Sequence, residues 1–223
     1  MTVPMTPRRQ TALGLLAAAG VAMTQGNVTA QDLAPIMLPP PRADFGCSLA
    51  QALKLRRSQR EFAPRPLPLQ VLSELLWSAY GVNRPATQDR TAPSWRHARE
   101  TEIYPVMAEA AWRYDPIAHR LLAQLSGDFR GQTGAQDFVA SAPLTLVYVS
   151  DTTHMGGVSH EEQHRVAAAD IGFIGQNVYL YCASEGLACV FRASLDGERL
   201  AQALKLASGR FIGFAQTVGY PKG

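Results

Sequence analysis

The sequence predicts one α+β domain, in which helices and strands are mixed along the chain. Its 223 residues, 47% of them hydrophobic and 17% charged, are enough to enclose one core of ordinary size. Stretches with helical spacing of apolar residues and short apolar runs typical of strands follow one another without the strict alternation of a βαβ protein. No internal repeat and no second domain boundary interrupts this order.

The first part of the domain is expected to hold an extended segment and two helices. Residues 31–46 are rich in proline and predict an extended lead-in. Ser48 can cap a first helix that carries basic residues at its C-terminal end. Pro68 opens a second helix, whose apolar residues keep helical spacing until Gly81 ends it.

The second part is expected to hold most of the strands and one long helix, after a polar, arginine-rich loop at 83–100. The long helix over 161–184 is apolar on several faces, which indicates a central helix or a subunit interface. Strands are expected at 103–107, 111–114, 144–149, 187–191 and 211–220, and a shorter helix at 195–206.

The N-terminal segment has the features of an export signal in the expected order. An Arg8-Arg9 pair precedes an apolar stretch over 11–23, and small residues ending at Ala30 form a cleavage site. This order resembles a twin-arginine signal, so residues 1–30 are expected to be removed and the protein to be periplasmic. The alternative is a disordered tail. The stretch is too short and too rich in Ala and Gly to span a membrane.

Charge and cysteine content exclude several classes of partner. The net charge is +3, and it falls to near +1 without Arg8 and Arg9, which argues against a nucleic-acid surface. The three cysteines are an odd number, so no disulfide framework can use them all. Cys182 lies in an apolar helical pattern, where it is expected to be a small buried residue.

The basic segment RRSQR is the first candidate site. Arg56, Arg57 and Arg60 surround the hydroxyl of Ser58 at the exit of the first helix, and guanidinium groups bind phosphate through charge-assisted hydrogen bonds. Taken alone, the segment has a simpler explanation, because the helix dipole favours basic residues at a C-terminus.

Several segments read together resemble one family. In chain order they are RRSQREF, PLPLQVLSELLWSAYGVN, RTAPS, EIYPV, WRYDP, ADIGFIGQNVYLYCASEGLACV and QTVGYP. They are similar to the nitroreductase-like FMN flavoproteins, and within them to the dehydrogenase branch that includes the thiazoline and oxazoline oxidases. The resemblance covers about residues 48–222, so residues 47–223 are expected to form the FMN domain.

The resemblance implies an antiparallel-rich central sheet flanked by helices. It also implies a homodimer with a long central interface helix and two FMN sites between the subunits. Arg56, Arg57, Ser58 and Arg60 would then hold the phosphate, the ribityl chain and the pyrimidine edge of FMN. Because reduced flavin is negative near N1 and O2, Arg60 is the candidate that raises its electron affinity. Lys222 could complete the phosphate site, or it could be a frayed terminal lysine.

The arginine-rich loop both matches the family pattern and departs from it. Pro93 and Ser94 match a proline-serine pair that reaches the flavin from the second subunit. Three and five residues after that serine, the family pattern has Asn and Gln, whereas this chain has His97 and Arg99. Amides are thus replaced by a titratable ring and a permanent cation, so a different substrate, an anion for example, or weaker FMN binding is expected. Trp95 is either a substrate-stacking residue or a packing residue.

Three more residues are assigned to the flavin by resemblance. Ala193 and Ser194 lie in the turn whose backbone N–H faces flavin N5. A backbone donor suits this role because it stays fixed while N5 changes between acceptor and protonated forms. Asp170 falls where relatives have a polar residue near the ring, although a solvated acid in the first half of the helix is the alternative.

A zinc-protease motif is the main rival. His160, Glu161 and His164 form a literal H-E-x-x-H, which places two imidazoles one helical turn apart with Glu as general base. The charged neighbours Glu162 and Arg165 do not fit a buried zinc helix, and Glu185 would have to be the third ligand across an unbroken helix.

The sequence as a whole predicts an exported FMN-dependent oxidoreductase. The reaction is expected to be ping-pong two-electron transfer through flavin N5 with a small organic substrate. No catalytic side chain, metal site, nucleic acid or membrane is assigned. NAD(P)H is not supplied to the periplasm, so the electron donor or acceptor stays open. A zinc metalloprotease or a non-catalytic flavin-binding or ligand-binding dimer are the alternatives.

Overall fold

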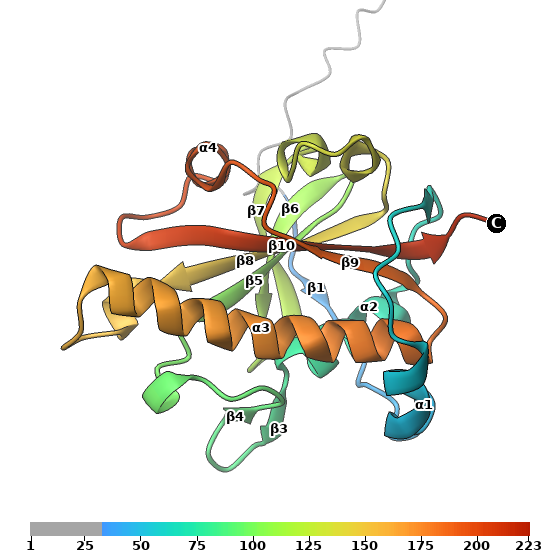
Figure 1. Ribbon diagram of the computed structural model, residues 1–223, viewed down its shortest axis with the longest axis horizontal. Helices are drawn as coiled ribbons and strands as arrows, with labels where there is room; N and C mark the ends of the chain where they lie inside the picture. The colour runs from blue at the N-terminus through green and yellow to red at the C-terminus, as the bar shows by residue number, and fades with distance from the viewer. Residues whose placement is uncertain (1–32) are drawn as a thin grey trace, which may run out of the picture.

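The computed structural model describes residues 33–223, which form a large antiparallel sheet with helices on both faces (Figure 1). The strand order is β1-β7-β6-β5-β8-β10-β2, and β9 pairs with β10 beside β2. Every strand pair is antiparallel, which confirms the predicted α+β class and the antiparallel sheet. The strands are β1 (Ile36–Met37), β2 (Phe62–Ala63), β5 (Thr101–Val106), β6 (Ala110–Asp115), β7 (Arg120–Ser126), β8 (Leu144–Asp151), β9 (Ala188–Arg192) and β10 (Arg210–Pro221).

The helices divide between the two faces of the sheet. In Figure 1, α4 (Gly197–Ala203) lies on one face, while α1 (Leu49–Leu55), α2 (Leu69–Tyr80) and α3 (His160–Ser184) lie on the other. Strand β8 is buried along its whole length because its alternating side chains enter two cores. Leu146 and Tyr148 pack with α2 and α3, and Val147 and Val149 pack with α4.

The predicted helix ends are confirmed by their caps. The Ser48 hydroxyl accepts a hydrogen bond from the Gln51 backbone N–H, and Gly81 ends α2. Helix α3 begins one residue earlier than predicted, where the Ser159 side chain caps it. Helix α4 is shorter than the predicted 195–206, because Asp196 caps its start and accepts the Arg199 backbone N–H.

Some elements were not predicted. Strand β7 was missed because Leu121 is its only fully buried residue, so its sequence lacks a clear apolar alternation. The predicted loop 83–100 contains a small hairpin of β3 (Val82–Arg84) and β4 (Asp89–Arg90). Cys182 and Cys189 are buried, as expected for the former, and no disulfide joins the cysteines of the described part.

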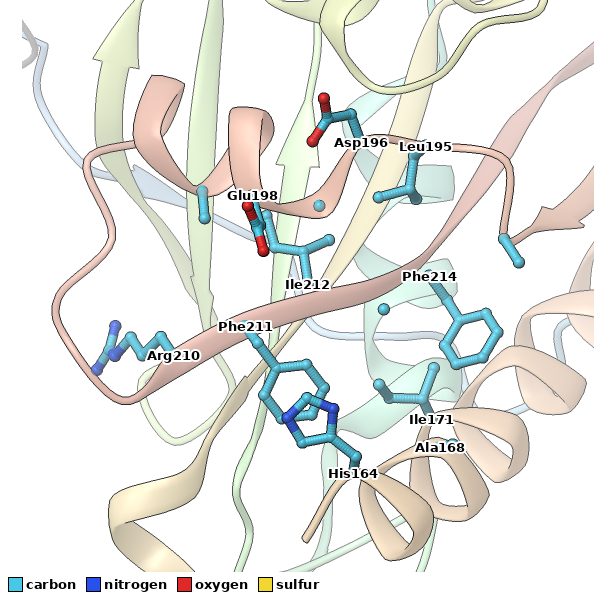
Figure 2. Close-up of a pocket in the computed structure, with 14 residues that line it drawn as sticks. His164, Ala168, Ile171, Leu195, Asp196, Glu198, Arg210, Phe211, Ile212 and Phe214 are labelled. Atoms are coloured by element: carbon cyan, nitrogen blue, oxygen red, sulfur yellow. The ribbon is translucent and has the colours of Figure 1, made fainter. Parts of the chain in front are cut away.

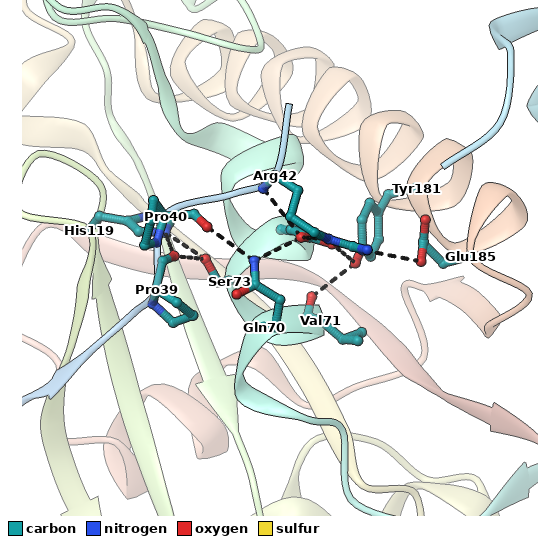
Figure 3. Close-up of polar contacts among 10 residues, drawn as sticks. Pro39, Pro40, Arg42, Gln70, Val71, Ser73, His119, Tyr181 and Glu185 are labelled. Atoms are coloured by element: carbon teal, nitrogen blue, oxygen red, sulfur yellow. Dashed lines mark hydrogen bonds and ion pairs between the residues drawn. The ribbon is translucent and has the colours of Figure 1, made fainter. Parts of the chain in front are cut away.

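The lead-in is integrated into the fold from its first described residue. This N-terminal strap, Leu33–Gly46, includes β1, which pairs with β7. Figure 3 shows its polar contacts: the Pro39 carbonyl accepts a hydrogen bond from the Ser73 hydroxyl, and the Arg42 guanidinium binds both oxygens of Glu74 at 2.7 and 2.9 Å. The predicted signal, residues 1–30, lies outside the described residues. Within residues 33–223 no helix is long and apolar enough to cross a membrane.

Candidate functional site

The predicted phosphate-binding segment leaves α1 and runs along the free edge of β9. The Gln59 backbone N–H donates to the Cys189 carbonyl at 2.9 Å, which fixes the segment to that strand. Within residues 33–223, no carboxylate lies within ion-pair distance of Arg56, Arg57 or Arg60, and their side chains make no hydrogen bond to the carbonyls of α1. In the described part of the chain, these three guanidinium ions therefore lie along one edge of the sheet without a carboxylate partner.

A tyrosine that sequence reasoning missed holds this segment in place. The Tyr179 hydroxyl on α3 lies 2.7 Å from the Ser58 hydroxyl and accepts the Phe191 backbone N–H at 2.8 Å. The Arg56 guanidinium lies over the Tyr179 ring, 5.3 Å from its centroid. One side chain thus connects the basic segment, the central helix and β9.

Lys222 lies close to the same segment. Strand β10 continues past β9 to pair with β2, so Tyr220 lies opposite Ala63. The Lys222 backbone N–H then donates to the Glu61 carbonyl at 3.3 Å. The backbone of Lys222 is therefore held next to the basic segment, which disfavours a frayed end, while its role at the phosphate stays a prediction.

The predicted N5 turn follows β9 directly, and Ala193 and Ser194 are both exposed there. Behind the turn, the Phe191 ring packs against Phe214, with ring centroids 5.0 Å apart. On α3, only glycine fits at position 175, because a Cβ would lie 2.7 Å from the Phe191 ring. Close packing of this kind gives the turn a rigid support.

The arginine-rich loop lies at the other half of α3. Asp170 is buried and its carboxylate accepts the Trp95 backbone N–H at 2.7 Å, so it is not a solvated acid. Tyr179 on the same helix lies nine residues further, about 13 Å along the axis. A single chain therefore does not bring Pro93, Ser94 and His97 to the basic segment, and the contribution of this loop to a second subunit stays a prediction.

His97 and Arg99 do not form an open anion site within the chain. The Arg99 guanidinium donates to the Thr87 carbonyl at 2.9 Å and pairs with Asp89 at 3.3 Å. The His97 ring is 3.6 Å from the same carboxylate, and 81% of this side chain is exposed. Both basic groups thus have an acid beside them.

Glu100 and Asp170 form a buried carboxyl pair beside the arginine-rich loop. Glu100 is fully buried, and burial together with the neighbouring Asp170 raises the pKa of Glu100 to about 7. Burial raises the pKa of Asp170 as well. The pair therefore takes up a proton as the pH falls through about 7, while Asp170 holds the Trp95 backbone.

A cavity of about 590 Å³ opens between α3, α4 and the first half of β10 (Figure 2). Ala193 and Leu195 of the N5 turn form one end of its wall, and Arg210 forms the other. Its volume is in the range of small-molecule sites. No sequence pattern indicates this cavity, because its wall comes from three separate segments.

The zinc motif does not form a metal centre. The His164 ring stacks on Phe211, with centroids 4.0 Å apart, and His160 and Glu161 are exposed at the start of α3. Glu185 follows the other end of this helix, about 30 Å from His164. In the described part of the chain, no group of three or more His, Cys, Asp or Glu side chains could hold a metal ion.

Comparison with known proteins identifies the family of this chain. The sequence profile of the Nitroreductase family matches residues 53–220, so the chain belongs to the nitroreductase family. Membership implies flavin-dependent oxidoreduction. Two relatives are both named "putative nitroreductase". One, from Methanocaldococcus jannaschii, is 29% identical over 171 residues, which are 71% of this chain and 84% of that protein. The other is a crystal structure from Ralstonia eutropha JMP134, 40% identical, with a TM-score of 0.81 over 85% of this chain and 90% of that one.

Two more distant structures share the fold. The NADPH:FMN oxidoreductase of Vibrio harveyi, solved with NAD+, is 20% identical with a TM-score of 0.59, over 78% of this chain and 69% of that one. The Escherichia coli microcin synthetase complex McbBCD contains a chain that is 15% identical with a TM-score of 0.65, over 96% of this chain and 85% of that one. The predicted nitroreductase fold is therefore confirmed.

Proposed function

We propose that this protein is an exported, homodimeric FMN-dependent oxidoreductase that transfers two electrons in ping-pong fashion to or from a small organic substrate. The observation that carries the proposal is the set of unpaired cations along β9: Arg56, Arg57 and Arg60, with Lys222 held beside them. Within residues 33–223 none of these cations pairs with a carboxylate, and Arg56, Arg57 and Lys222 suit a phosphate dianion. The Vibrio harveyi structure of the same fold is named for FMN, which adds support for this flavin.

The chain's own residues would act by binding and orienting. A bound flavin supplies reversible two-electron chemistry at N5. Arg56 and Arg57 would hold its phosphate, and Arg60 would place positive charge at the pyrimidine edge, which favours the reduced form. Tyr179 would fix Ser58 relative to β9. The exposed backbone of Ala193 and Ser194 would face N5, and no side chain has to act as acid or base.

The dimer is supported by apolar surface that a single chain leaves exposed. Leu49, Leu53 and Leu55 on α1 and Phe173 on α3 are all more than half exposed. These helices lie on the same face of the sheet (Figure 1), and large apolar side chains exposed on one face suit an interface. A partner related by twofold symmetry about α3 would bring its Pro93 and Ser94 toward the basic segment.

Loss of the phosphate site tests the proposal. Arg56→Ala removes a charge-assisted hydrogen bond worth about 1.5–3 kcal/mol, so FMN should bind about 10- to 150-fold more weakly without loss of fold. Arg199→Ala is the control, because Arg199 is an exposed cation on the opposite face of the sheet. Unchanged FMN affinity in Arg56→Ala would contradict the assignment.

Export and turnover have their own tests. Replacement of Arg8 and Arg9 by lysine should abolish transport into the periplasm and leave the longer, uncleaved chain in the cytoplasm. Stoichiometric flavin that no donor can reduce would instead favour a non-catalytic binding protein. His160→Ala should leave activity unchanged, and joint loss of zinc and activity would revive the metalloprotease.

A further inference from the structure

Arg192 is a buried cation at the end of β9, directly before the turn assigned to flavin N5. Only 5% of this residue is exposed. Within residues 33–223, no carboxylate lies within ion-pair distance of its guanidinium. Buried charges in proteins are usually paired, because removal of a cation from water without a counterion costs free energy. An uncompensated buried charge is thus retained beside a proposed redox site.

The surroundings of Arg192 are neutral and largely apolar. Because side chains alternate along a strand, Arg192 shares one face of β9 with Val190, which packs in the small core around Phe62. The carbon of the guanidinium lies 5.9 Å from the centroid of the Phe138 ring. Burial lowers the pKa of Arg192 to about 10, so the side chain still carries its charge at neutral pH.

Neutral hydrogen-bond acceptors fix the guanidinium in place. Its Nε donates to the Thr217 hydroxyl at 3.1 Å, and its Nη1 donates to the Thr133 carbonyl at 3.0 Å and to the Gln136 side-chain oxygen at 3.3 Å. Nη2 is buried and has no hydrogen-bond partner in the described part of the chain. Only glycine fits at position 134, because a Cβ there would overlap Nη1. The segment 133–136 therefore closes over a charge that stays at the end of β9.

The position of this charge relates it to the proposed flavin site. Ala193 and Ser194, whose backbone is assigned to N5, follow Arg192 directly in the chain. Reduced flavin is more negative than oxidised flavin, so a fixed cation nearby stabilises the reduced form. The guanidinium faces the segment 133–136, so its effect on the ring would be exerted through space. This step rests on the proposed function, whereas the burial and the missing counterion do not.

We infer that the buried charge of Arg192 tunes the redox equilibrium of the bound flavin, because it raises the affinity of this chain for reduced FMN relative to oxidised FMN. A unit charge that acts over roughly 10 Å, at an effective dielectric constant of about 20, changes such an equilibrium on the order of tenfold. Water screens the exposed Arg60 more strongly than the buried Arg192. Arg192 is therefore expected to contribute to the flavin potential without touching the ring.

Gln136→Glu tests the inference with Arg192 left in place. The substitution puts a carboxylate at the position 3.3 Å from Nη1 and so neutralises the buried charge. Gln132→Glu is the matched control, because Gln132 is exposed on the same segment and no hydrogen bond joins it to Arg192 in the described structure. The dissociation constants of oxidised and of dithionite-reduced FMN are measured anaerobically for each protein.

The preference for reduced FMN is the ratio of these two constants. It should fall about tenfold in Gln136→Glu and change by less than about twofold in Gln132→Glu. Removal of the charge by Arg192→Met should lower the preference in the same way, whereas Arg192→Lys, measured at pH 6 so that the lysine stays protonated, should retain it. A merely structural role would weaken the binding of both forms of FMN equally. An unchanged preference in Gln136→Glu, or the same change in Gln132→Glu, would overturn the inference.

A measurement without flavin separates this inference from the proposed function. In flavin-free Gln136→Glu, NMR titration should find the pKa of the new carboxyl well below the ordinary value of about 4.3, because the Arg192 charge has no other counterion. An ordinary pKa there would overturn the inference whether or not the protein binds flavin. If the pKa is low and the unsubstituted protein binds no FMN, the proposed function is wrong, and the role of Arg192 toward flavin with it. If FMN binds and the preference is unchanged, only the role of Arg192 is wrong.

Discussion

Replacement of Glu100 by glutamine should remove a pH dependence from the stability of the fold. Glu100 is fully buried next to Asp170, and the pKa of Glu100 is raised from 4.5 to about 7. A glutamine keeps the oxygen that accepts the Thr101 hydroxyl at 3.0 Å, and its amide can donate to Asp170 as the protonated acid does. The variant therefore imitates the protonated form at every pH.

The size of the effect follows from the two pKa values. An acid whose pKa is raised on folding stabilises the fold fully below pH 4.5 and loses this contribution as the pH rises through 7. The difference of about 2.5 pKa units corresponds to up to about 3 kcal/mol in the free energy of unfolding. Relative to Glu100→Gln, the unsubstituted protein should lose this amount between about pH 4.5 and pH 8.

Urea denaturation at half-unit pH steps measures the difference. Glu109→Gln is the control, because Glu109 is exposed. The plots of unfolding free energy against pH for this variant and for the unsubstituted protein should run parallel. Parallel curves for Glu100→Gln as well would show that the carboxyl pair does not hold a proton in the folded state, and would refute the reasoning about the buried pair.

Two further substitutions test the strap and the positioning tyrosine. In Arg42→Met, the buried Glu74 loses the guanidinium that holds its pKa at about 2, so NMR titration should find the Glu74 pKa at or above the ordinary 4.5; a value still near 2 would show that the strap does not set it. Tyr179→Phe removes the acceptor of the Phe191 N–H and the partner of Ser58, so it should lower stability by about 1 kcal/mol and weaken FMN binding about fivefold. FMN titration of both proteins checks this, and equal affinity would limit Tyr179 to a packing role.

Local signals in the sequence predicted most of the helices and strands. The Ser48 cap, the Gly81 stop and the continuous apolar run of β8 each act within a few residues, so the sequence displays them directly. Strand β7 was not predicted because its side chains are mostly half-buried. Its place in the sheet is decided by its neighbours β1 and β6. Burial of this kind depends on tertiary structure and has no local pattern.

The candidate site was likewise predicted only in part. The basic segment was visible as a cluster of residues close in sequence, and the structure leaves its cations unpaired. Tyr179 was not visible, because it meets Ser58 from 121 residues away. The cavity lies where β9 no longer pairs with β10. The structural role of Asp170 comes from its hydrogen bond to the backbone of Trp95, which lies 75 residues away in the sequence. Contacts of these kinds arise only when the chain is folded.

The absorption spectrum of the purified protein, loaded with FMN and freed of excess, tests the central claim most directly. The account predicts a two-banded yellow flavin spectrum with one flavin per chain, released as FMN when the protein is denatured. A folded protein that stays colourless after incubation with FMN would contradict it, and one zinc ion per chain in that colourless protein would point to His160 and His164 instead.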